Sequence, residues 1–193
     1  MRGGRHIGEG CYYHLGSRGN FKQAIVVDDF DRTMWTQLLG AVTRKSDWLI
    51  LAYCLMTNHF HLVVQAGRSS VSDAMQVLNG EFSRRANGRW KRRGHLFENR
   101  FHSEPILSDA HLLEACRYVD LNPCRAGICP SPEDWQWSSY RAAVGKAHPP
   151  AFLAVGELLG LFGPDPVRAR EAYREFVLSR HVLVSDTVFW DCD

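Results

Sequence analysis

Two β-rich runs joined by a very short turn are the feature that most constrains how this chain can fold. Trp48–Met56 and His59–Gln65 are both rich in aliphatic and aromatic residues, and only Thr57-Asn58 separates them. So short a connection can join only antiparallel neighbours, because parallel strands need a crossover of a dozen or more residues. The sequence therefore predicts a β-hairpin over residues 48–65.

The segments around this hairpin place it in a longer order of elements. A strand is predicted over Cys11–Gly16, and a helix over Asp28–Asp47, where apolar residues recur at helical spacing. A second helix is predicted over Ser70–Ala86 and a short strand over His102–Leu107, which Pro105 suits to a sheet edge. The resulting order, β-α-β-β-α-β, predicts an α+β fold with a ferredoxin-like antiparallel sheet.

Helical patterns continue after the last predicted strand. We expect the first of these helices to begin at Ser108 or Asp109 and to stop at Asn122-Pro123. A Pro-rich break at residues 148–150 then suggests a division into a domain over residues 1–147 and a C-terminal helical appendage over 151–193. The final stretch, HVLVSDTVFWDCD, departs from the helical pattern, and we assign it no function. The predicted helices are Asp109–Leu121, Phe152–Leu161 and Pro166–Arg180.

Composition narrows the class of protein. The chain has 193 residues, 45% of them apolar, which is typical of a globular protein of about one domain. We see no apolar run near the roughly 20 residues that a membrane helix needs, and no secretory signal at the N-terminus. The six cysteines form no C-x-x-C pair, which indicates reduced thiols. We therefore expect a cytoplasmic protein without a membrane partner.

Charge is concentrated in one segment although the net charge is only +2. Residues 84–100 hold seven Lys and Arg against one acid, a local charge of +6, so the rest of the chain sums to −4. A basic stripe on a slightly acidic body is typical of a polyanion site. Trp90, Phe97 and Phe101 lie among these charges and could stack on bases. The alternative is a solvated, charged helix end and loop.

The hairpin carries an unusual pair of histidines. His59 and His61 are two apart on a predicted strand, so both point to one face while Phe60 points to the other. Two imidazoles can ligate one divalent ion but cannot fill its coordination shell, so a metal site would need a further ligand. Alone, the pattern is more typical of ordinary surface histidines than of a metal site.

A second candidate pair lies on the helix predicted after the last strand. Tyr118 and Asn122 are four residues apart and so share a helical face. They could be a core tyrosine and a C-terminal helix cap, because Asn122 precedes Pro123. In a ferredoxin-like sheet, however, this helix can lie across the face of the strand that carries His59 and His61. Asn122 could then supply an oxygen ligand, with Tyr118 beside the metal.

Five motifs occur together and in a consistent order, within a match that runs from about Cys11 to about Arg180. As a set, they resemble the REP-associated tyrosine transposases, a branch of the single-tyrosine HUH transposases of bacterial insertion sequences. The resemblance implies that His59 and His61 bind a metal and that Tyr118 is the nucleophile. It also places Asn122 where the superfamily often carries a glutamine as third ligand. The motifs are YCLMTNHFHLVV, LNGEFSRRANGRW, GHLFENRF, CRYVDLNPCRAG and WQWSSYRA.

The resemblance also implies an activity and a partner. The tyrosine would attack a phosphodiester in single-stranded DNA, giving a 5′-phosphotyrosine link and a free 3′-hydroxyl. Nitrogen and oxygen ligands without thiolate suit Mg²⁺ or Mn²⁺. The substrate would be a palindromic DNA hairpin, bound by a monomer or a homodimer, and the early segment YHLGSRGN is expected to contact DNA. The expected phosphate contacts are Arg18, Arg84, Arg85, Arg92 and Arg93.

Three other functions remain open at this point. A domesticated protein could bind the REP hairpin without transposing DNA. A zinc hydrolase would need more ligands, and His95, His102 and His111 show no supporting spacing, while the chain is too short for a (β/α)₈ barrel. A relaxase or replication-initiator nuclease would usually be longer and joined to a helicase domain.

Overall fold

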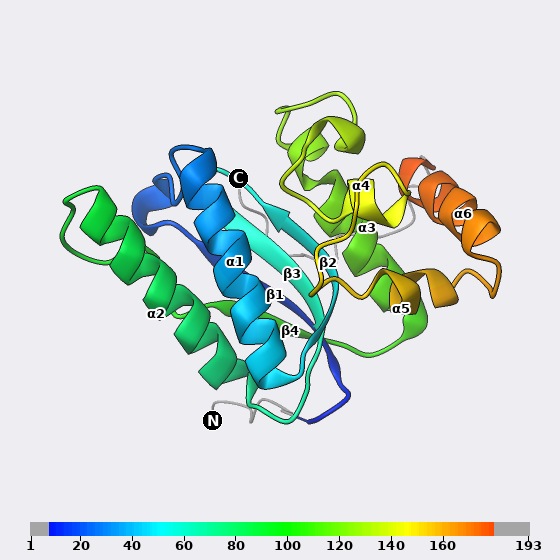
Figure 1. The fold of residues 1–193 in the computed structure, drawn as a ribbon, viewed down its shortest axis with the longest axis horizontal. Helices are drawn as coiled ribbons and strands as arrows, with labels where there is room; N and C mark the ends of the chain where they lie inside the picture. Colours follow the sequence, from blue (N-terminus) through cyan, green and yellow to red (C-terminus); the bar gives the residue numbers. More distant parts are fainter. Residues whose placement is uncertain (1–7, 180–193) are drawn as a thin grey trace.

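The computed structural model describes residues 8–179 and contains one sheet of four antiparallel strands. The strands are β1 (Tyr12–Arg18), β2 (Leu49–Leu55), β3 (His59–Gln65) and β4 (His102–Ile106). Their order across the sheet is β2-β3-β1-β4, so β1 and β3 are internal (Figure 1). This confirms the predicted ferredoxin-like α+β fold, with the hairpin as β2 and β3 and the proline-bearing β4 at an edge.

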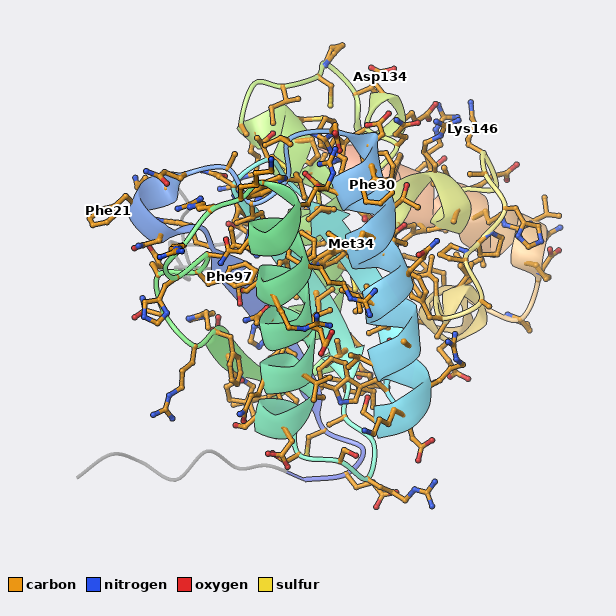
Figure 2. All side chains as sticks on the ribbon, turned by 60° about the vertical axis from the view of Figure 1, so that its left-hand side comes forward. Phe21, Phe30, Met34, Phe97, Asp134 and Lys146 are labelled. Carbon is orange, nitrogen blue, oxygen red and sulfur yellow. The ribbon has the colours of Figure 1, made fainter. Side chains whose placement is uncertain are left out.

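Two long helices, α1 (Asp29–Ser46) and α2 (Val71–Arg89), cover one face of the sheet side by side (Figure 1). The side chains of Asp28 and Ser70 cap their N-termini by accepting backbone N–H bonds. Aliphatic and aromatic residues fill the space between these helices and the sheet, and Trp35, Phe60 and Phe82 are fully buried there. Figure 2 views the molecule from this side, with Phe30 and Met34 on α1.

The opposite face is covered by α3 (Asp109–Arg125), with α4 (Tyr140–Ala143), α5 (Val155–Gly160) and α6 (Pro166–Leu178) beside it (Figure 1). Residues of α3, α5 and α6 share one hydrophobic cluster with residues of β2 and β3. The predicted division at residues 147–151 stays a prediction, but α5 and α6 pack into the core of the sheet domain. Within residues 8–179, no helix is long and apolar enough to cross a membrane. The stretch 181–193 lies outside the described residues.

The predicted end of α3 at Asn122-Pro123 is wrong. The helix runs on to Arg125 with Pro123 buried inside it. Proline cannot donate an N–H bond to the preceding turn, but here the later turns still close, because Ala126 N donates to Asn122 O. The true stop is Gly127, which adopts a left-handed conformation (φ 68°), with Ile128 N bonded to Pro123 O in a Schellman motif.

Candidate active site

Strand register gathers polar side chains on the sheet face that α3 covers. On β1, Gly16 pairs with His61 and Arg18 pairs with His59, while His14 pairs with Val63. Paired residues of antiparallel strands point to the same side of a sheet. His14 and Arg18 therefore share this face with His59 and His61, and all four are buried.

Helix α3 brings the second predicted pair to the same place. His59 Nε2 lies 3.1 Å from the Asn122 side-chain oxygen. The ring centre of Tyr118 lies 5.4 Å from that of His61, nearly perpendicular to it. The structure thus brings together His59, His61, Tyr118 and Asn122, which we call the candidate active site. Their catalytic and ligand roles stay predictions.

The donor set fits a divalent cation. Burial lowers the pKa of His59 to about 4, with Arg18 contributing and the Asn122 hydrogen bond opposing, and burial lowers the pKa of His61 well below 6.5. Both imidazoles are therefore neutral near pH 7, the form that binds metal. Adjacent ligands of an octahedral ion with bonds of about 2.1 Å stand roughly 3 Å apart. The separation between His59 Nε2 and the Asn122 oxygen matches that spacing.

The amide of Asn122 is essential to this interpretation. Among residues 8–179, no group of three His, Cys, Asp or Glu side chains is arranged to hold a metal ion. A metal at the candidate active site would therefore depend on two imidazoles and one amide oxygen. Such a set, without thiolate or a third imidazole, suits Mg²⁺ or Mn²⁺ better than structural zinc.

Two residues that sequence reasoning did not single out also contact this site. His14 Nε2 lies 3.0 Å from His61 Nδ1, and burial lowers the pKa of His14 to about 3. A proton on His61 Nδ1, shared with His14, would make Nε2 the nitrogen through which His61 binds metal. The guanidinium of Arg125 lies 4.9 Å from the ring centre of Tyr118. Two sequence signals could have found these residues. His14 and Arg18 are four residues apart on one strand and so share a face, and Tyr118 and Arg125 are seven residues apart on one helix and so share a face.

The predicted DNA-contacting arginines are divided between two places. Arg18 lies on the candidate-site face of the sheet, as the register shows. The remaining four lie on α2 or directly after it, on the side of the sheet opposite α3. Arg84 and Arg85 both pair with Glu81. Arg92 donates to the side chain of Gln23, and Arg93 is exposed.

Some of the basic segment has a structural role. Arg89 binds both Asp28 and Asp31, which ties α2 to the start of α1. The indole of Trp90 donates to Asp31 at 3.1 Å, so its polar edge is already engaged. By contrast, Phe21 is 83% exposed and projects from the turn after β1 (Figure 2).

Comparison with models of protein families identifies the family of this chain. The model of the IS200-like transposase family matches residues 8–122, more than half of the sequence. The chain belongs to the IS200-like transposase family. No curated protein matches it.

Two solved structures are similar to it. One is described as a REP-associated tyrosine transposase bound to a REP hairpin; it is 16% identical, has a TM-score of 0.65, and the match covers 80% of this chain and 91% of that one. The other is a putative transposase from Deinococcus radiodurans R1, 18% identical with a TM-score of 0.44, covering 62% of this chain and 96% of that one. The first likeness supports the ferredoxin-like fold described above.

Proposed function

We propose that this protein is a metal-dependent tyrosine transposase that cleaves and rejoins single-stranded DNA beside a palindromic hairpin. The observation that carries the proposal is that Tyr118 lies against His61 on the same buried, polar face where Asn122 meets His59. Membership of the IS200-like transposase family supports the same reaction class.

In the proposed reaction, Tyr118 Oη attacks the scissile phosphorus. A bond from phosphorus to the tyrosine oxygen forms as the phenol gives up its proton, the bond to the 3′ oxygen breaks, and that oxygen takes a proton from solvent as it leaves. One ester replaces another, so the step is reversible without ATP, as cutting and rejoining require.

The side chains of the candidate active site have separate tasks in this proposal. His59, His61 and Asn122 would hold Mg²⁺ or Mn²⁺, which when bound neutralises and orients the scissile phosphate. Arg18 lies beside His59 in register and adds positive charge on the same face. Arg125, stacked over the Tyr118 ring, would orient that ring and favour its anionic form.

The proposed partner is a DNA hairpin with an adjoining single strand. A REP hairpin is bound in the solved structure of similar fold, and the basic segment of this chain suits a polyanion. Arg84, Arg85, Arg92 and Arg93 would contact phosphates away from the candidate active site. The functional unit would be a monomer or a homodimer.

The test is covalent adduct formation on hairpin DNA. Palindromic repeats beside the gene would supply the substrate, labelled on the strand 3′ to the cleavage site. With Mg²⁺ or Mn²⁺ we expect the wild-type protein to form a denaturation-resistant adduct. Tyr118→Phe should bind the same DNA and form none, whereas the control Tyr12→Phe, on β1, should form it. An adduct on Tyr118→Phe would show that the nucleophile is another residue.

A further inference from the structure

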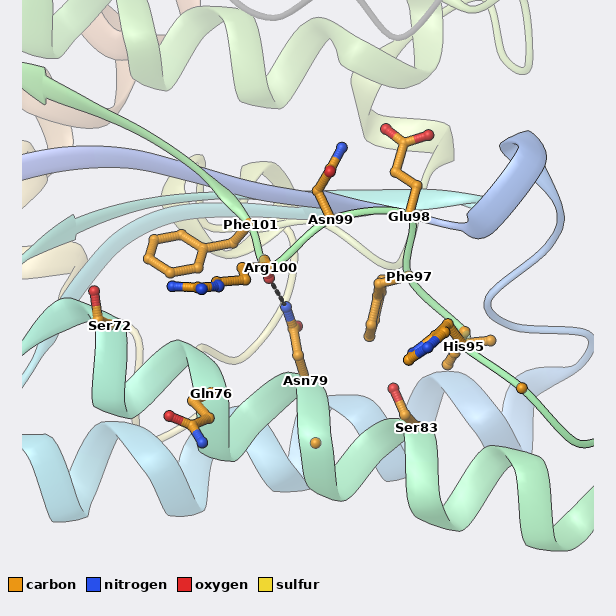
Figure 3. Close-up of a pocket in the computed structure, with 13 residues that line it drawn as sticks. Ser72, Gln76, Asn79, Ser83, His95, Phe97, Glu98, Asn99, Arg100 and Phe101 are labelled. Atoms are coloured by element: carbon orange, nitrogen blue, oxygen red, sulfur yellow. Dashed lines mark hydrogen bonds between the residues drawn. The ribbon is translucent and has the colours of Figure 1, made fainter. Parts of the chain in front are cut away.

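A cavity of about 730 Å³ lies outside the candidate active site, between α2 and the segment over residues 94–101 (Figure 3). Its volume falls in the range of small-molecule sites, roughly 300–1,000 Å³. One wall is a single face of α2, and the other is the segment that leads into β4. None of its lining residues belongs to the candidate active site. The α2 wall consists of Ser72, Gln76, Asn79, Gly80 and Ser83.

Asn79 is the buried polar group at the centre of this cavity. Its side chain is 8% exposed, and its Nδ2 donates to Ser17 Oγ at 2.7 Å and to Arg100 O at 2.8 Å. Both amide hydrogens are therefore used. Its Oδ1 is buried and has no hydrogen-bond partner among residues 8–179. An unsatisfied buried acceptor is destabilising, so a ligand that brings an N–H or O–H donor to this oxygen would be favoured.

The other groups around Asn79 match a nucleotide. Phe97 and Phe101 supply aromatic surface, and the guanidinium of Arg100 lies alongside Phe101 (Figure 3). Aromatic rings and guanidinium planes are the surfaces on which unpaired bases stack. Arg100 also gives the outer wall a positive charge for phosphate. The one acidic lining residue, Glu98, points away from α2 (Figure 3).

The cavity is connected to the candidate active site through β1. Ser17, which accepts a hydrogen bond from Asn79, directly precedes Arg18, which shares a sheet face with His59. The Glu98 N–H donates to the Arg18 carbonyl at 3.0 Å, so the cavity segment crosses the end of β1. Adjacent residues of one strand thus serve the cavity on one side and the candidate active site on the other.

We propose that this cavity binds one unstacked, amino-bearing base of the single-stranded DNA that the candidate active site cleaves. The exocyclic amino group of adenine or cytosine would donate to Asn79 Oδ1, while Phe101 and Arg100 cover the face of the base. The cavity would thereby determine which nucleotide is accepted beside the hairpin. This inference rests on the proposed DNA-cleaving function.

Gly80 offers a way to fill the cavity without disturbing the fold. A Cβ added at Gly80 would meet no atom within 4 Å, and the residue lies on α2 at the cavity wall. Gly88 is a matched control, since it is also exposed on α2, has equal room for a Cβ and does not line the cavity. Replacing either glycine in a helix favours helix formation. Gly80→Leu and Gly88→Leu therefore differ in whether they occupy the cavity.

The experiment measures fluorescence anisotropy of labelled dA₁₂, dC₁₂ and a 12-unit abasic strand with each protein. We expect Gly80→Leu to bind dA₁₂ and dC₁₂ about tenfold more weakly than Gly88→Leu, because it removes the stacking of one base. The two variants should bind the abasic strand equally. Equal binding of the homopolymers by both variants would overturn the proposal, as would an equal loss on the abasic strand. So would binding of dAMP as tight as that of dA₁₂, since the site would then serve free nucleotides.

The adduct assay separates this proposal from the proposed function. If the wild-type protein forms the Tyr118 adduct but Gly80→Leu and Gly88→Leu bind alike, the base site is wrong and the cleavage function stands. If the base preference depends on residue 80 but no adduct forms, cleavage is wrong and the base site stands.

Discussion

The two faces of the sheet are both buried, but they contain different chemistry. On the side of α1 and α2, β3 contributes Phe60, which packs against Trp35 with ring centres 5.0 Å apart. On the side of α3, the same strand contributes His59 and His61. His14 is stacked on the His61 ring, and the rings of His59 and Tyr118 meet it edge-on.

The difference shows how one strand can serve stability and chemistry at once. Burying neutral imidazoles costs free energy that aliphatic side chains would not cost, unless each polar atom finds a partner. Here the partners are other site residues, as the contacts of His59 with Asn122 and of His61 with His14 show. A face that departs from the apolar pattern while keeping its burial is where function is expected.

The largest expected effect is that of His61→Ala on catalysis. Loss of one metal ligand removes several kcal/mol of charge stabilisation, so we expect adduct formation to slow by about 1,000-fold or more. Single-turnover assays on the hairpin substrate measure this rate. Circular dichroism should show the sheet and helices intact, because the strand keeps its register and its apolar face. Wild-type rates in His61→Ala would remove this residue from the metal site.

Substitution of the neighbouring residue Phe60, which points to the other face of the sheet, should lower stability. Phe60 is fully buried, and truncation of such a side chain costs about 3–5 kcal/mol. We therefore expect Phe60→Ala to lower the free energy of unfolding by that amount in urea titrations. Leu107→Ala is the control, since Leu107 is 86% exposed and should change stability by no more than about 0.5 kcal/mol. Equal effects of the two substitutions would contradict the division between the faces.

The sequence predicted the sheet and the meeting of His59, His61, Tyr118 and Asn122, whose roles stay predictions, because the elements that hold them have local signals. Each pattern can be recognised from residues close together in the sequence: the hairpin, the alternation of His59 and His61, and the helical spacing of Tyr118 and Asn122. The end of α3 differs from its prediction because the helix continues past Pro123 when the next turn closes, as the hydrogen bond from Ala126 N to Asn122 O shows. Gly127, with its left-handed conformation, was the better signal.

Other parts of the site depend on tertiary contacts that no local pattern contains. His14 meets His61 across 47 residues of sequence, and only the register of β1 with β3 brings them together. Similarly, the basic segment gave no sign that Arg89 and Trp90 would bind Asp31 on a neighbouring helix. A run of basic residues can be seen in the sequence, but the acids with which they pair can be identified only from the packing of the helices.

A smaller effect tests how α6 is joined to the sheet domain. Tyr173 donates to the buried carboxyl of Asp120 on α3 at 2.5 Å, and Ser139 donates to the other oxygen of that carboxyl at 2.8 Å. Burial raises the pKa of Asp120 to about 7, against the effect of these hydrogen bonds. We expect Tyr173→Phe to lower the free energy of unfolding by about 1–3 kcal/mol.

The shape of the unfolding curve decides whether the residues after the Pro-rich break fold separately. Because α6 shares its core with α3, we expect Tyr173→Phe to shift one common transition, followed by tryptophan fluorescence and circular dichroism. Ser179→Ala, at an exposed helix end, should leave the curve in place. A second, separate transition that alone responds to Tyr173→Phe would instead support an independent appendage.

The smallest expected effect concerns the exposed arginines on the apolar side of the sheet. Arg84 and Arg85 are 68% and 48% exposed, and each pairs with Glu81, so their removal together should change stability by no more than about 1 kcal/mol. If each contacts a phosphate, the double substitution to Ala should weaken single-stranded DNA binding and reduce the slope of log affinity against log salt by about 1.4, roughly 0.7 for each contact. Arg168→Ala, in an exposed ion pair on α6, is the control. An unchanged slope would make residues 84 and 85 a solvated surface and would remove them from the proposed phosphate contacts.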